Sequence, residues 1–231
     1  MASFSEVTKG SNTGTGLSTA DTASITPAVG DVIAVACYAF SNAPPATDRV
    51  TVTGGGLTWT LINAPLLVYG TRRFYVLRAT AGTPSTGALT IDFTGSGGET
   101  AEVVAWGVVR PVDLVFVGSD TETAADPAAT LTNTFTTTGT VAGILGFSGS
   151  NAGNITWSVD AGYSQLFQQG TGQASGGNIE AATKLADDTE FISTPSTTEH
   201  MASVVIWFAA AAGGPSIPVL AHHYRMLQGV G

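Results

Sequence analysis

Short segments rich in β-branched and aromatic residues recur along the whole chain, separated by clusters of glycine, proline, asparagine and serine. This alternation is typical of an all-β sandwich or barrel, and no stretch predicts a helix. Glycine and asparagine supply positive φ in turns such as "SGSNAGN", and proline interrupts the strand pattern in "PPATD". The predicted strands span residues 31–40, 49–53, 57–62, 72–80, 87–93, 100–109, 129–136, 140–148, 154–159, 163–168, 178–186 and 200–209.

The predicted strands form two series in the same order. "GDVIAVACYAFSNA" from Gly30 corresponds to "GTVAGILGFSGSNA" from Gly139, and "LTWT" corresponds to "ITWS". "RRFYVLRATAG" then corresponds to "NIEAATKLADD", and "ETAEVVAWGVV" to "EHMASVVIWFA". A period of about 100 residues is too long for a solenoid repeat. The correspondence pairs Trp59 with Trp157 and Trp106 with Trp207.

Each half alone would have open sheet edges, whereas two halves packed face to face would close one core. We therefore predict an all-β, jelly-roll-like sandwich built from two pseudo-repeated halves, about residues 28–110 and 129–210, within a single domain over 1–212. Two tandem immunoglobulin-sized sandwiches are the alternative. The stretch 110–128 has the composition of a crossover and not of a linker.

The order of motifs resembles a family of β-sandwich domains common in virion proteins of tailed bacteriophages. The matching pieces are "GDVIAVACYAF", "GLTWTLI", "RRFYVLRA", "ALTIDF" and "AEVVAWGVVRPVD", and Val112-Asp113 stands where the family has a V-D pair. The resemblance covers roughly residues 28 to 210. It implies a structural protein of the virion, assembled in the host cytoplasm. Its expected role is a capsid decoration or cement protein that binds the major capsid protein, copies of itself as a homo-oligomer, or both; a minor tail or fibre protein is the alternative.

Composition argues against two classes of partner. Only 11% of the residues are charged, against about 25% in an average soluble domain, so the surface must consist largely of Thr, Ser, Asn and Gly. The net charge of −9 repels a nucleic-acid duplex and an anionic membrane. The apolar run from Val204 is far shorter than the roughly 20 residues that a bilayer requires. We expect neither nucleic-acid nor membrane binding.

Signals of catalysis and metal binding are weak. "GFSGS" lacks the last glycine of a nucleophile elbow, and no lysine follows a glycine as in a P-loop. Cys37, the single cysteine, lies in an apolar run and is expected to be a small core residue. We therefore predict a protein that is not an enzyme and that has no cofactor and no metal site. The residues considered and set aside as metal ligands are His200, His222, His223, Asp187, Asp188 and Glu190.

Aromatic side chains raise the question of sugar binding, because jelly rolls often bind carbohydrates. The tryptophans occupy matching places in alternating strands, which favours packing, so we assign Trp59, Trp106, Trp157 and Trp207 to the core with Cys37. A host glycan remains a second alternative partner, in a carbohydrate-binding adhesion module. The candidates for stacking on a sugar are Trp59, Trp157, Tyr69, Tyr75 and Tyr163.

The composition changes after the last predicted strand. Gly213-Gly214-Pro215 ends the strand and Pro218 discourages its continuation, so residues 213–231 are predicted to form an extended C-terminal arm. Its apolar content is high for a free tail, which favours docking on a neighbouring subunit over folding back on its own domain. The expected contact residues are Ile217, Val219, Leu220, His222, His223, Tyr224, Arg225, Met226 and Leu227.

Overall fold

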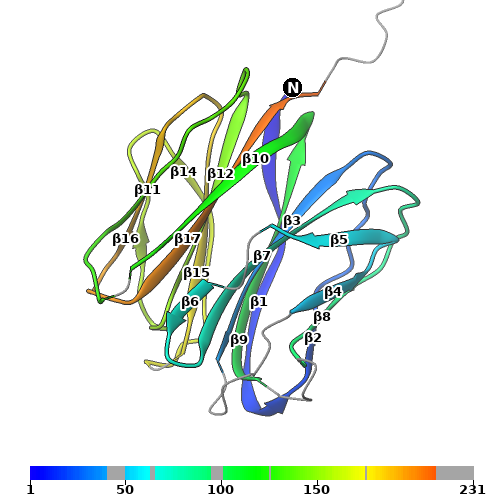
Figure 1. Cartoon of the computed structure of the whole chain (residues 1–231). Helices are drawn as coiled ribbons and strands as arrows, with labels where there is room; N and C mark the ends of the chain where they lie inside the picture. The colour runs from blue at the N-terminus through cyan, green and yellow to red at the C-terminus, as the bar shows by residue number, and fades with distance from the viewer. Residues whose placement is uncertain (41–49, 63–65, 95–100, 125, 175, 212–231) are drawn as a thin grey trace, which may run out of the picture.

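A computed structural model describes residues 1–40, 50–62, 66–94, 101–124, 126–174 and 176–211. Within these ranges the protein consists of seventeen strands and contains no helix (Figure 1). The strand pairs of the sheets are antiparallel. The prediction of an all-β fold made of packed antiparallel sheets is confirmed.

The first half of the chain forms one large and one small sheet. The large sheet has the order β1-β9-β3-β7-β5, with β6 also paired to β7, and the small sheet has the order β2-β8-β4. The strands are β1 (Ser3–Leu17), β2 (Thr19–Asp21), β3 (Val32–Phe40), β4 (Thr51–Gly54), β5 (Leu57–Leu61), β6 (Leu66–Tyr69), β7 (Arg72–Ala81), β8 (Leu89–Asp92) and β9 (Ala101–Val112).

The second half repeats this division. Its large sheet has the order β10-β17-β12-β15-β14, and its small sheet has the order β11-β16-β13. The strands are β10 (Leu114–Thr123), β11 (Leu131–Thr134), β12 (Gly143–Ser150), β13 (Trp157–Ser158), β14 (Ser164–Gly170), β15 (Asn178–Lys184), β16 (Glu190–Pro195) and β17 (Met201–Ala210).

The four sheets are stacked, with the large sheets inside and the small sheets on the two outer sides (Figure 1). Strands in the middle of the large sheets are therefore covered on both faces. Seven consecutive residues of β3 and all eight of β12 are buried. This explains why β3 is a nearly continuous apolar run, whereas a strand with one solvated face alternates apolar and polar residues. In β12 the buried positions also include glycines and the serines Ser148 and Ser150.

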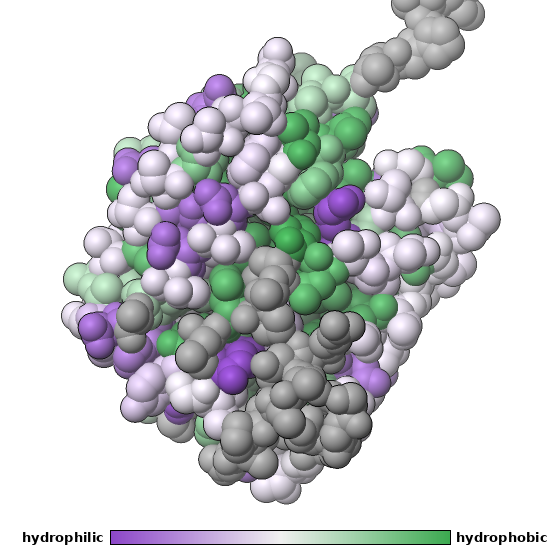
Figure 2. All heavy atoms as spheres, in the orientation of Figure 1, coloured by the Kyte–Doolittle hydropathy of each residue, from purple (hydrophilic) through white to green (hydrophobic). Residues whose placement is uncertain are grey.

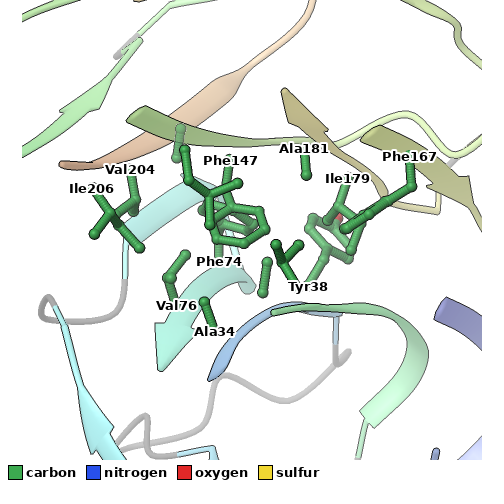
Figure 3. Packing of buried hydrophobic residues seen from close by; sticks show 14 of the residues in the cluster. Ala34, Tyr38, Phe74, Val76, Phe147, Phe167, Ile179, Ala181, Val204 and Ile206 are labelled. Atoms are coloured by element: carbon green, nitrogen blue, oxygen red, sulfur yellow. The ribbon is translucent and has the colours of Figure 1, made fainter. Parts of the chain in front are cut away.

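The central core lies between the two large sheets. Tyr38 and Phe74 of the first sheet point toward Phe147, Ile179 and Val204 of the second (Figure 3). The other face of each large sheet packs against its small sheet, around Trp106 in the first half and around Trp157 and Trp207 in the second. Apolar burial across three interfaces thus holds the layers together.

Glycines in the large sheets allow aromatic rings to pack directly on the backbone. A Cβ atom at Gly107 would overlap the ring of Phe167, and one at Gly149 would lie 2.7 Å from the ring of Phe74. Both contacts cross from one large sheet to the other. Real Cβ atoms do not approach other atoms so closely, so these positions require glycine for space.

The strand orders of the two halves correspond. The orders match when β1 is paired with β10, β2 with β11, β3 with β12, β4 with β13, β5 with β14, and β7 to β9 with β15 to β17. Strand β6 has no counterpart among the described strands. Trp106 and Trp207 occupy equivalent places, because each packs over a glycine of the neighbouring edge strand, Gly10 in β1 or Gly118 in β10. The jelly-roll arrangement is not confirmed, since the described strands form four sheets.

One predicted equivalence is wrong. Trp59 lies on β5 of a large sheet, whereas Trp157 lies on β13 of a small sheet. By strand order, β5 corresponds to β14 and β13 corresponds to β4. The similar segments "LTWT" and "ITWS" therefore belong to strands that are not equivalent. Their similarity reflects the β-branched and aromatic residues that are frequent in any strand.

We predict that Gly107→Ala lowers the free energy of unfolding by about 1–3 kcal/mol, because the new methyl group overfills the contact with Phe167. Gly87→Ala is the matched control, since a Cβ at Gly87 meets no atom within 4 Å. Equilibrium unfolding in denaturant measures both. Equal stability of the two variants would show that the sheets can separate enough to admit a methyl group.

Candidate interaction surface and buried polar layer

The two halves are joined by one residue, Asp113. Strand β9 ends at Val112 and β10 begins at Leu114, and Asp113 makes the turn with a φ of 56°, in a region that Asp tolerates better than most residues. The backbone carbonyl of Asp113 accepts a hydrogen bond from the amide of Ala211 at 2.8 Å. The Asp113 carboxylate also lies 2.5 Å from the Met1 amine. The last described residue is thus held beside the connection between the halves.

Strand β10 is an edge strand with exposed apolar side chains. Val115 and Val117 are 49% and 37% exposed, and Val117 lies at a bulge where the pairing with β17 shifts register. Phe116, between them, packs on the central core, and the Arg78 guanidinium lies 3.9 Å from its ring centroid. Most of the visible surface is of intermediate hydropathy (Figure 2). Two exposed valines on one free edge are therefore a candidate interaction surface.

The predicted docking residues of the arm, from Ile217 to Leu227, lie outside the described residues. The described chain ends at Ala211, directly after β17, whose last residue Ala210 lies opposite Leu114 of β10. The described chain thus ends at the same end of β10 as Val115.

The tryptophans and Cys37 lie in the apolar interior or at its margin. Trp106, Trp157 and Trp207 are buried, and Trp59 is half-buried at the edge of the first sandwich core. The Trp157 indole nitrogen donates to Asn178 Oδ1 at 2.9 Å. Cys37 is fully buried and free, and burial raises the pKa of its thiol, which makes the thiolate inaccessible.

Of the three tyrosines considered for stacking on a sugar, only Tyr69 presents an exposed ring. Tyr75 and Tyr163 are buried, whereas Tyr69 is 49% exposed. Tyr69 stacks on His200 with ring centroids 4.3 Å apart, and the Arg72 guanidinium lies 5.5 Å from the Tyr69 centroid. His200 thus makes an aromatic contact across the two halves, while His222 and His223 lie outside the described residues.

The acidic residues near position 190 form ordinary turn contacts. Asp188 pairs with Lys184 Nζ at 2.5 Å, and Asp187 accepts a hydrogen bond from Thr137. Burial opposes ionisation of Asp188, but hydrogen bonds from Lys184 and from backbone amides prevail and lower its pKa. Among the described residues, no group of three or more His, Cys, Asp and Glu side chains could hold a metal ion.

A layer of buried polar side chains crosses the interior of the second half. It divides the apolar cluster around Phe191 from the cluster around Met201. Asn133 donates to Ser203 at 3.4 Å, and Ser148 is hydrogen-bonded to Ser193. The first half has instead one continuous apolar cluster between its sheets. The members of the layer, each at most 1% exposed, are Asn133, Ser148, Glu180, Ser193 and Ser203.

Glu180 is the one ionisable side chain in this layer. Its Oε2 accepts a hydrogen bond from Gln165 Nε2 at 3.4 Å, and its Oε1 has no hydrogen-bond partner among the described residues. Burial raises the pKa of Glu180 to about 8, and hydrogen bonds from Gln165 and Ser148 offset only part of this effect. At neutral pH the side chain is therefore mostly the neutral acid.

Comparison of the chain with protein-family models, with curated proteins and with solved structures finds no match. The part of the chain that the structure describes contains no helix able to cross a membrane.

Sequence reasoning missed the features that the structure makes prominent. Val115 and Val117 lie in "DLVFVGSD", whose alternation of apolar residues indicates a strand, but the stretch was expected to cross between halves. Glu180 stands between apolar residues in "NIEAAT", so a charge inside a predicted strand was the available signal. Neither its burial nor the exposure of the valines could be inferred without knowing which faces are covered.

We predict that Glu180 makes stability depend on pH. Its pKa in the folded state, about 8, lies above the ordinary value of 4.5 because burial favours the neutral acid. The free energy of unfolding is therefore highest below pH 4.5, where Glu180 is protonated in both states, and it falls as the pH rises from 4.5 to 8. Glu180→Gln should match the wild type at pH 4.5 and should exceed it by about 3–5 kcal/mol above pH 8.

Denaturant unfolding across this pH range measures the effect. Glu190→Gln, the same substitution at an exposed position, is the control and should follow the wild type. Parallel pH profiles for wild type and Glu180→Gln would contradict the prediction.

We also predict opposite results for two aromatic truncations. Trp157→Ala should lower the free energy of unfolding by about 3–5 kcal/mol, because it empties a buried site and removes the partner of Asn178. Tyr69→Ala should lower it by less than about 1 kcal/mol, because the ring is half exposed. Thermal or denaturant unfolding distinguishes them. Similar losses for both would place Tyr69 in the structural core.

Proposed function

We propose that this chain is a structural protein of a tailed-phage virion, and specifically a capsid decoration or cement protein. One observation carries the proposal. The edge strand β10, with its exposed valines, begins directly after Asp113, and Ala211, the last described residue before the C-terminal arm, is hydrogen-bonded to Asp113. An edge strand with exposed valines offers backbone and apolar contacts to a partner. The arm, which begins a few residues away, supplies a second point of attachment.

The rest of the molecule suits a module that must keep its shape on a particle. Three packed interfaces bury both faces of the large sheets, and the large sheets are joined by a single residue. The sequence resemblance to virion β-sandwich domains supports the same role. The expected partners are the major capsid protein and further copies of this chain, held by many weak contacts made at once, so that avidity retains the protein on the head lattice.

A minor tail or fibre protein is the alternative within the same virion context. A carbohydrate-binding adhesion module is the second alternative, and the exposed Tyr69 ring beside His200 and Arg72 is the observation that favours it. Glycan arrays probed with the wild type and with Tyr69→Ala test this alternative. Glycan binding that requires Tyr69 would support it.

Immunogold labelling of purified particles of the phage that encodes the chain tests the main proposal. We expect label distributed over the head, and we expect purified chain lacking residues 213–231 to rebind stripped heads less well than the full chain. Label confined to the tail would support the tail or fibre alternative. Absence of the chain from purified particles would overturn the virion proposal.

A further inference from the structure

The outer edge of β10 can accept another strand. One edge of β10 pairs with β17 from Leu114 to Thr123, and no described strand pairs with the other edge. Backbone N–H and C=O groups along such an edge are a template for added strands. The exposed side chains of Val115 and Val117 stand on the same strand, so a partner would gain apolar contact as well as hydrogen bonds.

The direction of β10 indicates where a partner strand must come from. Ala210 lies opposite Leu114 and Ala202 opposite Thr123, so the described chain ends at the Leu114 end of β10, and residues 213–231 follow from there in sequence. A strand that adds antiparallel to β10 must enter at the Thr123 end. The arm of the same chain would first have to travel back along a ten-residue strand, about 33 Å at 3.3 Å per residue, and would use about half of its length.

The arm and the edge also have complementary character. Residues 213–231 contain Arg225 and two histidines, and they contain no acidic residue. Strand β10 contains Asp120 and Glu122 and no basic residue. The apolar residues of the arm, from Ile217 to Leu227, can make apolar contacts with the exposed side chains of Val115 and Val117.

We propose that the outer edge of β10 binds residues 213–231 of a second copy of this chain as an added antiparallel strand. The proposal deepens the proposed function, since it assigns the arm a self-association site. Antiparallel addition agrees with the pairing seen throughout the described sheets and is the more stable arrangement per residue. Repeated from copy to copy, arm-to-edge contact links subunits into a ring or chain.

The experiment measures self-association of the full chain by light scattering coupled to size exclusion across a concentration series. We expect concentration-dependent oligomers for the wild type and monomers for the chain that ends at residue 212. The double variant Val115→Lys/Val117→Lys should require about tenfold higher concentration to associate. Val29→Lys is the control, because Val29 is an exposed valine (77%) outside the sheets and should leave association unchanged.

A labelled synthetic peptide of residues 213–231 provides the second measurement. It should bind the truncated chain and should bind the truncated Val115→Lys/Val117→Lys chain about tenfold more weakly. Circular dichroism and thermal unfolding establish that each variant is folded. A full chain that stays monomeric while the truncated chain binds the peptide would show docking within one chain and would overturn the proposal.

Oligomers unaffected by the lysine variants would place the interface elsewhere and would also overturn it. These outcomes are independent of the labelling of virions. A monomeric chain found on phage heads would overturn this inference and leave the proposed function standing. Arm-dependent oligomers of a chain that is absent from phage particles would support this inference and overturn the proposed function.

Discussion

The packing of the two large sheets on each other is the constraint on which the rest of the structure depends. It requires strands that are apolar on both faces, since the opposite face of each large sheet must also be covered by a small sheet. It also requires the sheets to approach closely, which Gly107 and Gly149 allow by admitting the rings of Phe167 and Phe74. Other glycines have a different role, since Gly30 and Gly139 have a positive φ and a Cβ at either would meet no atom.

The same constraint explains how much of the fold could be predicted. All twelve predicted strands are present, in the large and in the small sheets, because the β-branched and aromatic residues of each strand bury at least one face against the neighbouring sheet. Strand β1 was missed because its sequence, "SFSEVTKGSNTGTGL", is largely polar and does not indicate a strand. It is an edge strand, and hydrogen bonds to β9 hold it in the sheet. Strands β2 and β6 were missed because they are short, and β10 because this edge strand was interpreted as a crossover. Strand β16 is the middle strand of its small sheet, and it was missed because "EFISTP" sets only two large apolar residues among polar residues and a proline.

The internal correspondence shows the limit of pairing segments by composition. Trp106 and Trp207 are equivalent because each must lie over a glycine of the adjacent edge strand, which is a requirement of position. Trp59 and Trp157 share only their neighbours in sequence, and their strands belong to different layers. The candidate site was harder still to predict, since Val115 is notable only because β10 is left uncovered on one side. The arm residues remain predictions that the described residues do not test.

The polar layer distinguishes the second half from the first. Glu180 and its neighbours replace apolar contacts that the first half retains, so the second half holds its outer sheet with two smaller clusters and a strip of hydrogen bonds. Strand β10 belongs to this half, and its neighbour β17 contributes Ser203 to the layer. A partner bound on β10 would add backbone hydrogen bonds to the large sheet that contributes Ser148, Glu180 and Ser203 to the polar layer. Because Asp113 alone connects β9 to β10, the edge offered to a partner follows directly in sequence from the large sheet of the first half.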